Sequence, residues 1–256
     1  GRGRSLTGLE QIEHAAFLER ESANVHRAVE SALELGEGVL AARICAAMGL
    51  HWFTFGPSEA ALPWIEKTLE SAYDTISDEV AWTALWGAAI AWQRGDIPRF
   101  ERFEAEARRG WGLLDSKVGL ARVDHAVAQR LAMAGNHAEA LQRHRANLAV
   151  FEATGEIEGI VFSRAGAADA LVLLGRYDEI LAELEAALDV ARASGDYYLQ
   201  SHVLMRLPGA LLDQSDLDRS EQLSIEAERV ASLVRDRLAL PWAAVMRAWI
   251  AWARRC

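Results

Sequence analysis

Residues 155–195 read GEIEGIVFSRAGAADALVLLGRYDEILAELEAALDVARASG, and this stretch decides the fold. In its second half Leu181, Leu184, Leu188 and Ala191 recur at the spacing of one face of a helix. Glycines stand at both ends of the stretch and near its middle, and glycine readily adopts the left-handed conformation that ends a helix. Alternation of period two is absent, so strands have no support. The stretch therefore predicts two antiparallel helices joined by a tight turn.

Similar turn residues recur at regular intervals along the chain. The first turn of each period is found at Gly56-Pro57, Gly95-Asp96, Gly135-Asn136, Gly175-Arg176 and Ser215-Asp216. The second turn is found at Asp115, Gly155, Gly195 and Arg235. Before the first turns, small residues let paired helices approach closely, at Gly49, Ala88, Ala128 and Ala168. We therefore predict an all-α fold, a right-handed α-solenoid of antiparallel helix hairpins with a period of about 40 residues.

The expected organisation is one superhelical domain over residues 1–256. A linking helix occupies 6–37, and five hairpins plus a truncated sixth occupy 38–256. The first helices of the hairpins are expected to begin near Val39, Asp78, Lys117, Glu156 and Asp196, with a final helix from about Leu238. Because that final helix leaves Trp249, Ile250 and Trp252 uncovered, we expect the native protein to continue. Contacts between copies through Trp242, Trp249 and Trp252 are the alternative.

The repeat resembles the tetratricopeptide (TPR) family, although it is longer than the usual repeat. The best copy has the family's small, bulky, Gly, Tyr, bulky and Ala anchors at Ala167-Ala168, Leu171, Gly175, Tyr177, Leu184 and Ala187. It departs from the family at Ile180, where Ala is usual.

The segment 6–70 has a second, more specific resemblance. Its residues are similar to a segment of bacterial multidomain regulators that follows a nucleotide-binding ATPase module: Gln11, Leu18, Glu21, Asn24, Val25, Ala28, Val29, Trp52, Gly56, Trp64, Ile65, Glu66, Lys67 and Leu69. Ala61 and Pro63 depart from that pattern. The resemblance implies the sensor region of a signal-transducing (STAND-type) ATPase regulator of the antibiotic-regulatory, LuxR or cyclase-linked type, with the ATPase module as an adjacent partner.

Composition and charge exclude several classes of protein. The chain is 51% hydrophobic with 2 Cys, which excludes disorder and a disulfide-braced scaffold. Its net charge of −10 makes direct nucleic-acid binding unexpected. The longest strongly apolar stretch, 82–92, is too short to cross a membrane, and the free cysteines without an export signal favour the cytoplasm.

Catalytic and metal-binding motifs are not found in the sequence. It has no phosphate-binding loop of the Gly-x4-Gly-Lys-Ser/Thr type and no His-Glu-x-x-His or Cys-x-x-Cys pair, so we expect no cofactor, no metal and no enzyme activity. His137 and His144 are expected to be exposed on a second helix. Cys45, six residues from His51, is expected to be a small buried core residue rather than a nucleophile.

The candidate site is the concave groove that the first helices line in such solenoids. Repeat arithmetic places there a set of aromatic, charged and amide residues: Arg43, Phe53, Trp82, Trp92, Gln93, Arg122, His125, Gln129, Phe162, Asp169, His202, Arg206 and Asp213. Its Arg and His residues would form a basic strip suited to an acidic peptide or anionic ligand. The alternatives are that Trp82, Trp86 and Trp92 pack as core and that the basic residues are solvated or paired within helices.

Pro208-Gly209 falls within an expected first helix, where it predicts either a local bend or an opening of the groove. The sequence thus predicts a non-catalytic sensor domain that binds a protein, peptide or small effector. A stand-alone adaptor or scaffold and the regulatory tail of a nucleotide cyclase are the alternatives.

Overall fold

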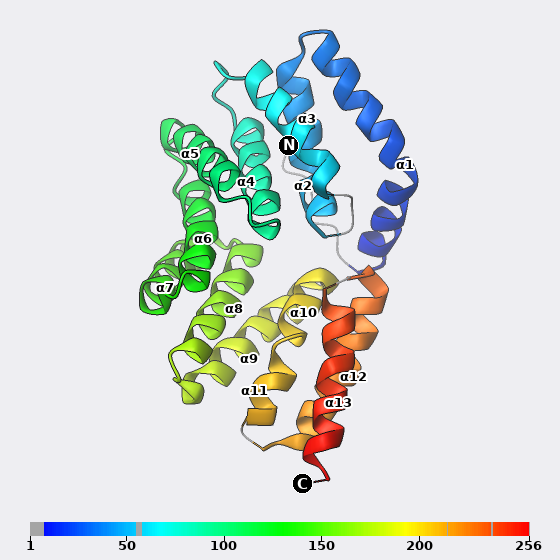
Figure 1. Cartoon of the computed structure of the whole chain (residues 1–256), viewed down its shortest axis with the longest axis vertical. Helices are drawn as coiled ribbons and strands as arrows, with labels where there is room; N and C mark the ends of the chain where they lie inside the picture. Colours follow the sequence, from blue (N-terminus) through cyan, green and yellow to red (C-terminus); the bar gives the residue numbers. More distant parts are fainter. Residues whose placement is uncertain (1–7, 55–57, 214, 237, 256) are drawn as a thin grey trace. The chain divides into compact units, whose positions relative to one another are not determined.

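The computed structural model describes residues 8–54, 58–213, 215–236 and 238–255, and every regular element within them is a helix (Figure 1). The predicted turn at Gly56-Pro57 lies outside the described residues. The helices are α1 (Gly8–Glu34), α2 (Gly38–Thr54), α3 (Ser58–Ser71), α4 (Asp78–Gln93), α5 (Ile97–Leu113), α6 (Lys117–Met133), α7 (His137–Thr154), α8 (Ile157–Leu173), α9 (Tyr177–Ser194), α10 (Tyr197–Leu204), α11 (Leu207–Asp213), α12 (Leu217–Val234) and α13 (Ala239–Ala253).

The helices follow one another as the hairpins that the sequence predicts. Helices α4 and α5 pack side by side, as do α8 and α9. The first helix of each hairpin begins within about one residue of its predicted start, at Gly38, Asp78, Lys117, Ile157 and Tyr197. All-helical hairpins at this spacing confirm the predicted fold class.

Left-handed residues end the helices at regular places. Positive φ angles occur at Gly95, Gly135, Gly155, Gly175 and Gly195, and also at the non-glycine residues Asp115, Ser215 and Arg235, where φ is 49°, 64° and 55°. After Gly175 the amide of Arg176 donates a hydrogen bond to Leu171 O (3.0 Å), which satisfies a carbonyl at the end of α8. A break about every 20 residues therefore limits each of the helices α4 to α9 to 16–18 residues.

The chain divides into two compact units, one that includes residues 15–126 (unit 1) and one that includes residues 127–256 (unit 2). Each unit has its own apolar core. In unit 1 the core includes Trp52, Phe100 and Trp111, all fully buried. In unit 2 it includes Leu171 and Leu184. The prediction of one continuous superhelical domain stays a prediction.

Glycines within helices allow an aromatic ring to lie directly against a neighbouring backbone. A Cβ at Gly119 would lie 2.2 Å from the Trp111 ring, and one at Gly159, 40 residues later, would lie 2.4 Å from the Phe151 ring. Real atoms do not approach this closely, so any larger residue would force the helices apart. These contacts fix the antiparallel register of α5 against α6 in unit 1 and of α7 against α8 in unit 2.

The α7–α8 interface buries three polar side chains. His144 is buried above Gly166, where a Cβ would lie 2.4 Å from the imidazole. The expectation that His144 is exposed was therefore wrong: glycine on the facing helix leaves room for the ring. The register set by the contacts of Gly159 with Phe151 and of Gly166 with His144 pairs Asn147 with Ser163, and both are buried. Asn147 Nδ2 and Ser163 Oγ have no hydrogen-bond partner among the described residues.

The bend predicted at Pro208 is present as a complete break in the helix. Helix α10 ends at Leu204, and α11 begins at Leu207. Proline has no amide hydrogen and its ring clashes with the carbonyl four residues earlier, so the regular ladder cannot continue. The amide of Arg206 instead donates to Val203 O (2.9 Å).

Candidate binding surface on the first helices

One repeat position recurs on successive first helices, and it carries most of the chemistry of the predicted site. Trp82, Arg122, Phe162 and His202 are spaced 40 residues apart, on α4, α6, α8 and α10, and Arg43 on α2 comes 39 residues before Trp82. The four later side chains are half-buried, whereas Arg43 is exposed. Rings and cations therefore alternate at one position of the repeat.

In unit 1 this position forms a cluster around Trp82. The Arg122 guanidinium carbon lies 4.7 Å from the centroid of a Trp82 ring, a cation–π arrangement. Trp86 stacks beside Trp82 with centroids 5.9 Å apart, and Trp111 meets it edge-on at 5.5 Å. Trp86 also packs on Gly49, where a Cβ would lie 2.0 Å from the indole. Trp82 thus has both a packing role and a surface role.

In unit 2 the same position forms what we call the aromatic patch: Phe162, Tyr198 and His202. The Phe162 and His202 rings meet edge-on at 4.7 Å, and Tyr198 lies 6.5 Å from each of them. All three side chains are half-buried, on α8 and α10. Tyr198 was not predicted, although its place one helical turn before His202 is a signal that could have identified it.

Arg206 is held in the turn between α10 and α11. Its Nε lies 2.9 and 3.1 Å from the two carboxylate oxygens of Asp169, and Nη2 donates to one of them at 3.0 Å. Nη1 donates to the backbone carbonyl of His202 at 2.6 Å. In a continuous helix this carbonyl would accept from the Arg206 amide, which here donates to Val203 O instead. The structure thus brings together Asp169, His202 and Arg206, three of the predicted site residues. It also pairs the positive charge of Arg206, which the predicted basic strip was expected to offer to a ligand.

The other predicted residues lie on the same helices but outside these two clusters. Trp92 and Gln93 end α4, and the Gln93 amide donates to Phe53 O at 3.3 Å. His125 and Gln129 are half-buried on α6. Whether Trp92, His125 and Gln129 bind a ligand stays a prediction.

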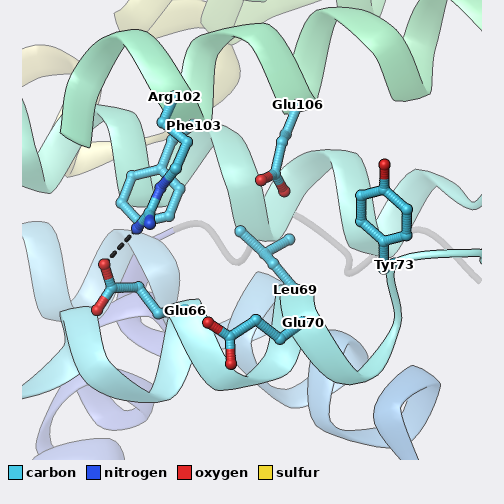
Figure 2. A pocket seen from close by; sticks show the side chains of 7 residues that line it. All are labelled: Glu66, Leu69, Glu70, Tyr73, Arg102, Phe103 and Glu106. Carbon is cyan, nitrogen blue, oxygen red and sulfur yellow. Dashed lines mark hydrogen bonds and ion pairs between the residues drawn. The ribbon is translucent and has the colours of Figure 1, made fainter. Parts of the chain in front are cut away.

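A small pocket lies away from these positions, between α3 and α5 (Figure 2). Its cavity of about 60 Å³ is far smaller than the several hundred Å³ typical of small-molecule sites. Arg102 pairs with Glu66 at one end, and Glu70 and Glu106 lie toward the other. Burial raises the pKa of the Glu106 carboxyl; Arg102 and Arg109 oppose this rise and Glu70 adds to it. No sequence motif predicted this pocket.

In the described part of the chain no cluster of three or more His, Cys, Asp and Glu residues could hold a metal ion. None of the described helices is long and apolar enough to span a membrane. Cys45 is fully buried 3.6 Å from Thr68 Oγ1, and burial raises the pKa of its thiol to about 11. This confirms that Cys45 is a core residue, because a nucleophilic cysteine needs a lowered pKa.

No protein-family model matches the sequence, and no curated protein matches it. Several solved structures are similar in fold. A Rap protein complexed with competence and sporulation factor has a TM-score of 0.68 at 13% identity, over 79% of this chain and 56% of that one. Yeast Tom70 has a TM-score of 0.59 at 16% identity, over 94% of this chain and 47% of that one.

The third similar structure is a signal transduction ATPase with numerous domains (STAND) that has a tetratricopeptide repeat sensor, from Pyrococcus horikoshii. Its TM-score is 0.56 at 15% identity, over 95% of this chain and 43% of that one. At such identities the likeness shows the fold alone, and the chain spans about half the length of these proteins. The chain is a TPR-like α-solenoid.

Proposed function

We propose that this chain is a non-catalytic interaction domain that binds a peptide or small effector on the concave face lined by its first helices. The observation that carries the proposal is the recurring position on these helices. There the Arg122 guanidinium carbon lies 4.7 Å from a Trp82 ring centroid in unit 1. In unit 2 the ring centroids of His202 and Phe162 are also 4.7 Å apart. Aromatic and arginine side chains held in place by neighbours are the residues that dominate binding energy at interfaces.

The finer proposal is that the domain is the sensor of a bacterial signal-transducing transcriptional regulator in the cytoplasm. It is supported by the resemblance of residues 6–70 to such regulators and by the similarity in fold to a STAND protein with a tetratricopeptide repeat sensor. Ligand binding would shift how the repeats pack on the adjacent ATPase module. Such a shift requires the ligand to bind the two states with different affinity.

Selection of peptides from a phage-displayed random library on the purified chain tests the proposed surface. Selected peptides, fluorescently labelled, are titrated with the chain and with variants while polarisation is measured. We expect Trp82→Ala or Phe162→Ala to weaken binding by about tenfold or more, depending on the peptide. The matched controls, Tyr177→Ala on α9 and Ile225→Ala on α12, change exposed side chains of second helices and are expected to leave affinity unchanged. Binders sensitive only to these controls, or no binders at all, would refute the proposal.

A further inference from the structure

We propose that the unit 2 part of this surface takes an uncharged aromatic or aliphatic side chain of an extended peptide, together with one of that peptide's backbone carbonyls, rather than an acidic group. The inference rests on the proposed function and specifies its ligand. It departs from the anionic ligand that the Arg and His residues of the sequence suggest when they are counted alone.

The charge of Arg206 is already compensated within unit 2. Asp169 contacts its guanidinium through both carboxylate oxygens, at 2.9 to 3.1 Å. The Arg206 side chain is only 20% exposed. A ligand carboxylate would have to displace Asp169 or lie beside it, and the negative charge of Asp169 offsets most of the attraction that Arg206 would exert on that carboxylate. The pair therefore disfavours an anion and tolerates a neutral group.

Arg206 nevertheless keeps hydrogen-bonding capacity for a neutral ligand. A guanidinium has five N–H groups, and here Nε, Nη1 and Nη2 each use one. One N–H therefore remains on each terminal nitrogen, and a peptide carbonyl can accept from such donors. Because Asp169 and the His202 carbonyl already hold the guanidinium in place, little side-chain entropy is lost when the carbonyl binds.

The aromatic patch supplies the apolar part of the same site. His202 belongs to both parts, since its ring meets Phe162 at 4.7 Å while its carbonyl accepts from Arg206. Tyr198 adds a third half-buried ring one turn away. Rings in such an arrangement offer flat apolar surface to another aromatic or aliphatic side chain and lose little entropy on binding. An extended peptide combines such a side chain with neutral carbonyl acceptors at every residue, so it fits both parts of this site.

The test uses the peptides selected from the phage-displayed library, grouped by their response to Phe162→Ala. Peptides that lose about tenfold or more in affinity with this variant are expected to be rich in aromatic and aliphatic residues and not in Asp or Glu. Their affinity is expected to change little between low and high salt, because no net charge is neutralised on binding. Replacing the aromatic residue of the peptide by alanine should cause a similar loss. Tyr198→Phe should retain binding, whereas Tyr198→Ala should weaken it, with circular dichroism confirming that both variants are folded.

Two outcomes would overturn the inference, and they are distinguishable from failure of the proposed function. If the Phe162-dependent peptides are acidic and lose affinity steeply with salt, the surface binds an anion and only the ligand class is wrong. If all binders depend on Trp82 and none on Phe162, unit 2 is not the site although the domain still binds peptides. Binders that respond only to second-helix variants, or none, remove both proposals.

Discussion

The polar pair between α7 and α8 yields the sharpest prediction about stability. Asn147 and Ser163 are buried and lie opposite each other, and Asn147 Nδ2 and Ser163 Oγ have no hydrogen-bond partner among the described residues. Neighbouring interfaces have an apolar pair at these repeat positions, Ala107 with Val123 and Ala187 with Val203, all buried. The combined substitution Asn147→Ala and Ser163→Val therefore converts this interface to the apolar pattern of the repeat.

The magnitude follows from two opposing effects. A buried polar group without a partner costs about 1–3 kcal/mol, so removing two of them stabilises the fold by about 2–6 kcal/mol. Deleting the amide of Asn147 leaves a small void that the larger valine side chain, introduced in place of Ser163, only partly fills, at a cost of about 1–3 kcal/mol. The midpoints of these two ranges give an expected net gain of about 2 kcal/mol. For a chain of this size each kcal/mol corresponds to about 2–4 °C in melting temperature.

Thermal unfolding followed by circular dichroism measures the change, and hydrogen exchange of the α7 and α8 amides shows that it arises in unit 2. The reciprocal variant, Ala187→Asn with Val203→Ser, is the matched control and is expected to lower stability by about 2–6 kcal/mol, since it creates two buried polar groups in an apolar interface. A lower melting temperature for the first variant would refute the reasoning. It would mean that Asn147 and Ser163 are satisfied, for example by a buried water that bridges them.

Three further predictions concern packing and ionisation. Gly49→Ala places a methyl group against a Trp ring of α4, so we expect a loss of about 1–3 kcal/mol by denaturant unfolding, whereas Gly112→Ala, with open space around it, should show no loss. In a Cys256→Ser background, Cys45 should resist alkylation until the protein unfolds, because burial raises the pKa of its thiol to about 11; rapid alkylation of the folded chain would contradict this. Because the pKa of the Glu106 carboxyl is raised in the folded state, its ionisation opposes folding at pH values above the pKa of this group in the unfolded chain. Glu106→Gln should therefore raise the melting temperature at neutral pH, with the gain vanishing as pH falls through the unfolded pKa; equal gains at acidic and neutral pH would contradict this origin.

The helices and their boundaries could be predicted from the sequence because they depend on local properties of the backbone. Gly135 and Gly175 end helices by adopting left-handed φ angles that other residues adopt at a cost. Pro208 breaks its helix whatever that helix packs against, because proline lacks an amide hydrogen. For the same reason the 40-residue period alone predicts that Trp82, Arg122, Phe162 and His202 occupy equivalent positions.

Burial and charge compensation were decided only by the tertiary structure, because they depend on what the facing helix presents. His144 is buried because Gly166 on α8 leaves space for its ring, although its own helix pattern predicted exposure. Arg206 is paired because Asp169, 37 residues earlier, lies within 3 Å across two first helices. The sequence by itself therefore determined the repeat and the residues at the recurring position of its first helices, whereas the packing of one hairpin on the next determined which side chains are buried and which charges are paired.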